Sequence, residues 1–303
     1  MNPLLHTCLV LSSMLMPAVT AAQPGVAEDW LEERWPLQGA RRLHIDLPKA
    51  RLTLAAAPQA DSVAIDGRAW PAGFLKHQIH NGTLHIVWQA PLARPPAVLE
   101  LRLKLPPLEQ IYIEGQQLQL DLDDAATGRF HAQGNQLWLA GNLQAKHVRL
   151  QGLQGSVELE LQRLEQAELS LLNGPIRLQG ASGRVHLSSL NGDLHLQGQD
   201  LLRVELDNHT GAIELNTDLS REARVTVRTL NGNIRTRVGE GDFRCWFETL
   251  TGRWYLDDRP MPAITDSRNK RRIPCNPKPG QGGDPGPELH FTSHNGNLYL
   301  RTR

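Results

Sequence analysis

Residues 184–196, Arg-Val-His-Leu-Ser-Ser-Leu-Asn-Gly-Asp-Leu-His-Leu, place a short alternating segment on each side of an Asn-Gly turn. Val185 and Leu187 precede the glycine by seven and five positions, and Leu194 and Leu196 follow it by two and four. A period of two is typical of a strand with one buried face. The stretch therefore predicts two short strands joined by a tight turn.

The same pattern recurs along the chain at a spacing of about 20 residues. Hairpins do not require the same residue types to recur in one column. Stacked rungs do, because each rung buries its apolar face against its neighbours. We therefore predict an all-β protein, a right-handed parallel β-solenoid of about 20-residue rungs. The turn glycines of the repeat are Gly115, Gly134, Gly155, Gly174, Gly192, Gly211, Gly232, Gly252 and Gly296.

From residue 41 the chain divides into an N-terminal region and a solenoid with an insertion. Residues 41–107 show strands without the repeated text, including Leu99–Leu105 and a hairpin signal at Asn81-Gly82. They predict an N-terminal β region that caps the coil. The solenoid then covers residues 108–303, and a Pro- and Gly-rich basic insertion at residues 257–287 interrupts it.

The N-terminal segment predicts export. Residues 1–22 have a short apolar core followed by small residues, as in a cleaved secretory signal peptide, and residues 23–40 would be a linker. The apolar core is too short to span a bilayer, so no membrane span is expected in the mature chain. Cys245 and Cys275 would then share an oxidising compartment, periplasm or cell surface, and form a disulfide.

Composition narrows the range of partners. The 303 residues include 32 basic and 32 acidic side chains, which gives a net charge of zero. Proteins that bind nucleic acid through its phosphates usually carry a positive field. The balance therefore argues against nucleic acid.

The repeat carries a family resemblance. Leu190-Asn-Gly192 and Leu230-Asn-Gly232 repeat one turn, and the strand Leu99–Leu105 is followed by Pro-Pro and then Ile111–Gly115. The chain resembles the bacterial putative-adhesin family from about residue 41 to residue 303, and it is also similar to the auto-transporter adhesin head domain family. The resemblance implies an exported β-solenoid of the cell envelope with no shared catalytic residues.

Three functions are compatible with this fold. The first is a non-enzymatic envelope protein whose surface binds a cell-surface polysaccharide or another envelope protein. The second is a β-helical carbohydrate-active enzyme that uses Glu168, His186 and Glu205, which fall in one outward column. The third is a scaffold without a ligand. We favour the first and expect no catalytic residue, no cofactor and no metal site.

One outward column is unusual because it repeats a single charge. Arg184, Arg203, Arg224 and Arg244 each lie eight positions before a turn glycine. Unit charges about 4.8 Å apart repel by about 0.9 kcal/mol in water. We expect Asp207, Glu222 or Glu248 to pair with these arginines, and a polyanion-binding strip is the alternative.

The C-terminal end offers the candidate binding residues. The final rung, Leu289 to Leu300, would leave an open edge that the insertion at 257–287 could cap. The insertion could instead form a binding site with neighbouring rings, whose polar edges suit sugar or peptide contacts. The residues of this candidate site are Trp246, Tyr255, His290, Tyr299, Arg268, Lys270, Arg271 and Arg272.

Overall fold

A computed structural model describes residues 30–68, 74–89, 99–239, 243–261, 271–275 and 286–302. The expected signal peptide at residues 1–22, and Arg268 and Lys270 of the insertion, lie outside the described residues. Within the described part, no helix has the length and apolarity required to cross a membrane.

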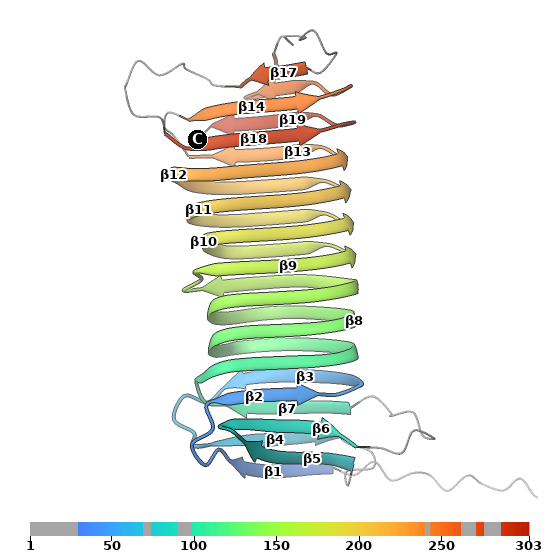
Figure 1. Cartoon of the computed structure of the whole chain (residues 1–303), viewed down its shortest axis with the longest axis vertical. Helices are drawn as coiled ribbons and strands as arrows, with labels where there is room; N and C mark the ends of the chain where they lie inside the picture. The colour runs from blue at the N-terminus through green and yellow to red at the C-terminus, as the bar shows by residue number, and fades with distance from the viewer. Residues whose placement is uncertain are drawn as a thin grey trace, which may run out of the picture.

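The chain winds into a long coil of parallel strands (Figure 1). Each rung pairs with the next in register, as where Leu187 lies opposite Leu206 and Leu206 lies opposite Val227. These inward residues are buried and form one continuous core. The predicted parallel β-solenoid is therefore confirmed. Its central strands are β8 (Leu108–Gln162), β9 (Gln166–Asn173), β10 (Ile176–Asn191), β11 (Leu194–Thr210), β12 (Ile213–Asn231) and β13 (Ile234–Val238).

The N-terminal strands form both the first rungs and their cover. β2 lies between β6 and β8, and β3 lies between β7 and β8, all in parallel. β1, β4 and β5 pair antiparallel with their neighbours, and β1 falls in the segment that we expected to be a linker. These strands are β1 (Trp30–Pro36), β2 (Arg42–Asp46), β3 (Lys49–Ala56), β4 (Ser62–Arg68), β5 (Leu75–His80), β6 (Thr83–Trp88) and β7 (Leu99–Leu105).

The order of the C-terminal rungs in space differs from their order in sequence. β18 pairs with β12 on one side and with β14 on the other, and β19 likewise lies between β13 and β15. The expectation that the final rung forms the open end of the coil is therefore wrong. The strands concerned are β14 (Arg244–Thr249), β15 (Trp254–Leu256), β16 (Arg259–Pro260), β17 (Arg271–Pro274), β18 (Glu288–Ser293) and β19 (Leu298–Thr302).

Strands of the insertion lie against the rung that does end the coil. β17 pairs antiparallel with β14, and β16 pairs antiparallel with β15. The predicted disulfide joins Cys245 to Cys275, with Cα atoms 4.9 Å apart, and both residues are buried. The Cys275 backbone N–H also donates to the Cys245 carbonyl oxygen at 3.0 Å. The insertion is thereby fixed to the end of the core.

Turn glycines stack directly on one another. A Cβ on Gly296 would lie 1.8 Å from the carbonyl oxygen of Gly232, and one on Gly174 would lie 1.8 Å from that of Gly155. Only glycine allows the backbones to approach so closely. Gly115 and Gly134 do not belong to this column, because the turn residue that Gly155 stacks on is Leu137. The expected single column therefore begins later than predicted.

Candidate functional site

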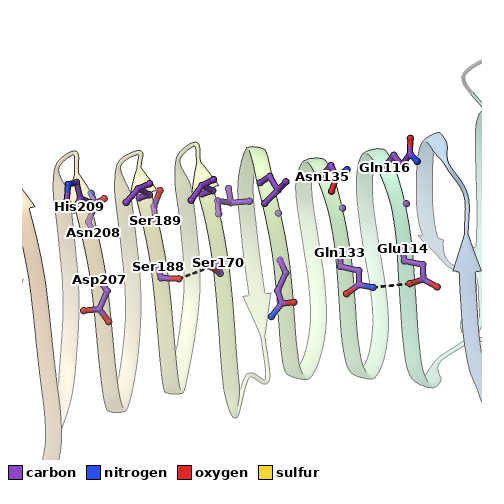
Figure 2. Close-up of a pocket in the computed structure, with 18 of the residues that line it drawn as sticks. Glu114, Gln116, Gln133, Asn135, Ser170, Ser188, Ser189, Asp207, Asn208 and His209 are labelled. Atoms are coloured by element: carbon purple, nitrogen blue, oxygen red, sulfur yellow. Dashed lines mark hydrogen bonds between the residues drawn. The ribbon is translucent and has the colours of Figure 1, made fainter.

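A long groove runs along one face of the coil, beside the turn glycines (Figure 2). Its volume is about 1080 Å³, and its lining extends over successive rungs from Asp46 in β2 to Asp207 and His209 in β11. With adjacent strands about 4.8 Å apart, six such steps give a length of roughly 30 Å. The groove therefore has the dimensions of an extended chain and not of a compact metabolite.

Neutral polar side chains are the commonest kind in the groove, which also holds the carboxylates of Asp46, Glu114 and Asp207. Ser188 donates a hydrogen bond to Ser170 at 2.9 Å from the neighbouring rung, and the pair is only partly buried. Amides and hydroxyls both donate and accept hydrogen bonds, so they match a ligand rich in hydroxyl groups. The neutral polar lining residues are Gln116, Gln133, Asn135, Gln151, Ser170, Ser188, Ser189 and Asn208.

Exposed leucines line the groove near the turns. Leu153, Leu172 and Leu190 each lie two positions before a turn glycine, and their exposed fractions are 52%, 44% and 42%. Leu250 holds the equivalent position in β14–β15 and is 44% exposed, but it does not line the groove. The groove thus combines hydrogen-bonding groups with a narrow apolar strip.

A hydrogen-bonded network closes the N-terminal end of the groove. Glu114 accepts from the Tyr112 hydroxyl at 3.1 Å and from Gln133 Nε2 at 2.9 Å, and its Oε1 lies 2.9 Å from His44 Nε2. Burial alone would raise the pKa of Glu114, but its hydrogen bonds with His44, Gln133 and Tyr112 outweigh burial and lower it. The carboxylate therefore stays ionised at neutral pH as a hydrogen-bond acceptor.

Two histidines beside this network resist protonation. Burial lowers the pKa of His85, and the neighbouring His44, with its Nδ1 3.2 Å from that of His85, lowers it further. Burial also lowers the pKa of His131, whose ring packs edge-on against Tyr112. The imidazoles of His85 and His131 therefore stay neutral to a lower pH than that of an ordinary histidine.

The three residues of the column proposed for catalysis lie on neighbouring rungs, but their side chains form ion pairs. His186 lies opposite Glu168 on one side and Glu205 on the other. Glu168 Oε1 is 3.6 Å from Arg149, and Glu205 is 3.3 Å from Arg228 and 3.6 Å from His186. None of the three column residues lines the groove. The carboxylates of Glu168 and Glu205 therefore both have ion-pair partners, and neither carboxylate lies in the groove.

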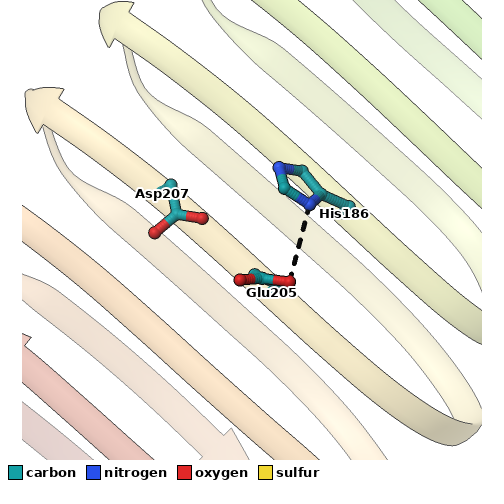
Figure 3. Close-up of side chains that lie close together, drawn as sticks. All are labelled: His186, Glu205 and Asp207. Carbon is teal, nitrogen blue, oxygen red and sulfur yellow. Dashed lines mark ion pairs between the residues drawn. The ribbon is translucent and has the colours of Figure 1, made fainter.

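His186, Glu205 and Asp207 also offer ligand atoms within 4.8 Å of one another (Figure 3). Arg228 Nη1 lies 3.3 Å from Glu205 and 3.1 Å from Asp207. Its guanidinium already supplies the positive charge that a metal ion would bring. We therefore assign no metal to this cluster.

The arginine column is interrupted by the intercalated rung. Glu288 lies between Arg224 and Arg244 and forms an ion pair with both. Glu288 is therefore the partner of Arg224 and Arg244 in place of the three acidic residues that we expected. The sequence did not suggest Glu288, because the repeat of Arg244 follows the repeat of Arg224 along the chain. Asp207 pairs with Arg228 instead.

The four predicted rings form two separate pairs. Trp246 stacks on His290 with ring centroids 4.7 Å apart, and Tyr255 stacks on Tyr299 at 4.9 Å. The first pair belongs to β14 and β18, which continue the face that carries the groove, and the second belongs to β15 and β19 beyond the turn. Arg271 and Arg272 lie in β17, next to β14.

Sequence reasoning did not identify the groove. The signal was present four positions before the turn glycines, where Gln151, Ser170, Ser188 and Asp207 follow one another in successive rungs. This column is polar without alternating charge, unlike the neighbouring column of Arg149 and Glu168. From Gln151 to Ser188 such a column would have indicated a surface not occupied by ion pairs, whereas Asp207 pairs with Arg228.

Residues 126–244 match the Toastrack DUF4097 family, which is a β-solenoid-like fold. This part of the chain is therefore similar to the Toastrack DUF4097 family, and the predicted resemblance to the putative-adhesin family is confirmed. No curated protein matches the chain significantly.

Three crystal structures are similar over most of the chain. One is a "putative adhesin" from Bacteroides fragilis, 11% identical, with 92% of this chain and 99% of that chain covered and a TM-score of 0.43. A "putative lipid binding protein" from Parabacteroides distasonis is 9% identical, with coverage of 89% and 96% and a TM-score of 0.44. A "putative cell adhesion protein" from Clostridium sporogenes is 10% identical, with coverage of 91% and 100% and a TM-score of 0.22.

Proposed function

We propose that this protein is an exported, non-enzymatic protein of the cell envelope that binds a linear polysaccharide along its groove. The observation that carries the proposal is the repetition of amide and hydroxyl side chains over successive rungs of a groove of about 1080 Å³. A polymer of sugars presents hydroxyl groups at regular intervals. It can therefore make the same kind of contact at each rung.

The leucine strip supports the same ligand class. Sugar rings have apolar C–H faces as well as hydroxyl groups, and the side chains of Leu153, Leu172 and Leu190 offer apolar contact beside the polar column. Binding clefts commonly combine an apolar lining with a few oriented polar groups. An extended peptide of an envelope protein is the partner that would compete with this proposal.

The buried disulfide supports the proposed location. Disulfides persist in oxidising compartments such as the periplasm and the cell surface, and they are rare in the cytosol. Cys245 and Cys275 are bonded within the core at the end of the coil. The proposal places the protein outside the cytoplasm on this ground and on the signal-like residues 1–22.

We also propose that Trp246 extends the contact beyond the groove. Trp246 and His290 lie on the face that carries the groove, whereas Tyr255 and Tyr299 lie on strands beyond the turn. Trp246→Ala should therefore weaken polysaccharide binding severalfold, and Tyr299→Ala should not. Equal effects of the two substitutions would remove Trp246 from the proposal.

The main test uses a pair of leucines with matched exposure. Purified protein is applied to an array of neutral envelope polysaccharides, and each captured glycan is titrated against Leu190→Arg and Leu250→Arg. Leu190→Arg should abolish binding because it places a long charged side chain in the groove, whereas Leu250→Arg should bind normally. Both variants should melt like wild type. Capture of peptides alone, or equal binding by the two variants, would contradict the proposal.

A further inference from the structure

Three arginines occupy equivalent positions in consecutive rungs. Arg184 lies opposite Arg203, and Arg203 lies opposite Arg224, and all three side chains are exposed. Adjacent strands are about 4.8 Å apart, so the three side chains leave the backbone at that interval. We call this row the arginine ladder.

The ladder differs from the other outward arginines of the coil. Arg177, Arg228 and Arg235 each form an ion pair with a carboxylate on another rung. Arg184 and Arg203 form no ion pair or side-chain hydrogen bond within the part of the chain that the structure describes. Arg224 reaches Glu288 only at 3.9 Å, through its Nε atom. The repulsion along the ladder is therefore left largely uncompensated by the protein.

The ladder is narrow and has defined ends. The adjacent column on the same three strands holds His186, Glu205 and Thr226, and so no arginine or lysine. Along the coil, Gln166 precedes Arg184 and Glu288 follows Arg224. The positive strip is thus one residue wide and three rungs long. A strip of this shape fits a single extended anionic chain that follows the axis of the coil.

Other anionic partners fit the strip less well. A membrane surface or a nucleic-acid duplex is broad, and it would bring negative charge against Glu205 in the adjacent column and Glu288 at the end of the ladder. The net charge of the chain is also zero, so no general positive field would hold such a surface. Shape and charge together favour one thin chain with regularly spaced anionic groups.

We propose that the arginine ladder binds a linear polysaccharide that carries carboxylate groups, a polyuronate. Guanidinium groups bind carboxylates through two parallel hydrogen bonds, and this geometry selects planar carboxylate groups. Regularly placed carboxylates along such a chain could engage successive arginines. The inference goes beyond the proposed function, because no arginine of the ladder lines the groove.

The test compares two double variants that remove the same charge. Arg184→Gln with Arg203→Gln removes two arginines of the ladder, and Arg177→Gln with Arg235→Gln removes two arginines that are paired with Glu158 and Glu214. The probes are polygalacturonate and its fully methyl-esterified form, titrated by calorimetry at low and moderate salt. The ladder variant should bind polygalacturonate at least about tenfold more weakly than wild type.

The control variant and the other probes distinguish a polyuronate from other ligands. The control variant should retain wild-type affinity, and binding of the methyl ester, a neutral chain of the class proposed for the groove, should be the same in the ladder variant and in wild type. Equal losses in the two variants, a loss of ester binding in the ladder variant, or absence of polygalacturonate binding by wild type would overturn the inference. So would tighter ladder-dependent binding of single-stranded DNA or of phosphatidylglycerol vesicles. The ladder variant should still capture the neutral glycan that wild type binds in its groove, which distinguishes failure of the ladder from failure of the groove.

Discussion

The indole ring of Trp246 stacks on the imidazole ring of His290, forty-four positions later in the chain, with ring planes 18° apart. The contact exists because the last rung of the sequence, which contains β18, is the second-to-last rung of the coil in space. His290 consequently has Thr226 on its other side. Strands β18 and β19 thus lie between the rung of β12 and β13 and the rung of β14 and β15, which follow one another in the sequence.

Phe291 tests this intercalation. It is buried between Val227 and Phe247, with neighbours on both rungs. Phe291→Ala should lower the free energy of unfolding by about 3–5 kcal/mol, because it leaves a cavity that neither neighbour can fill. Chemical denaturation measures the change. Thr292→Ala on the outward side is the control, and a loss below about 1 kcal/mol for Phe291→Ala would contradict the arrangement.

Gly296 tests the stacking of the turns. Its Cβ, if present, would lie 1.8 Å from the Gly232 carbonyl oxygen, so Gly296→Asn should destabilise the protein by about 3 kcal/mol. Gly39→Asn is the control for backbone strain alone, because a Cβ at Gly39 would have no heavy atom within 4 Å, and its φ of 83° costs Asn less than other side chains. Thermal melting should separate the two variants clearly. Similar melting would show that the turns do not stack as described.

The disulfide should stabilise the cap of the coil. Cys245 and Cys275 are 30 residues apart, and closing a loop of that length contributes about 3–4 kcal/mol in the chain-entropy model. Replacing both by Ala should lower the unfolding free energy by about that amount. A thiol assay on the denatured wild-type protein should find no free thiol at these positions. Two free thiols would refute the bridge.

Acidification should destabilise the N-terminal end of the coil. The pKa values of His85 and His131 are lowered in the folded protein, so below about pH 6.5 the unfolded chain binds more protons at these sites. Stability is therefore fully present above that pH and declines as pH falls below it, towards the lowered pKa values of the folded protein. His85→Gln with His131→Gln should flatten this decline in melting temperature. His209→Gln should not, and an unchanged slope in the double variant would count against the argument.

The sequence predicted the rungs because burial requires the same residue types in each column, as in Val185, Val204 and Val225. It could not predict the order of the last rungs. Leu289 fits beside Val225 and beside Cys245 equally well, so the residue types of the column do not indicate that its rung lies between the other two. The groove was missed for a related reason. Periodicity identifies which side chains point outward, but not where they leave space for a ligand.

The direct test of the proposed function is hydrogen exchange in the presence of a captured neutral polysaccharide. The account predicts slower exchange of the backbone amides at residues 170–174, 188–192 and 207–211, which lie along the groove. The equivalent turn at residues 249–252 should exchange at the same rate with and without the ligand. Protection confined to residues 176–178, 194–196 and 213–215 on the strands beyond the turn, or no protection at saturating ligand, would contradict it.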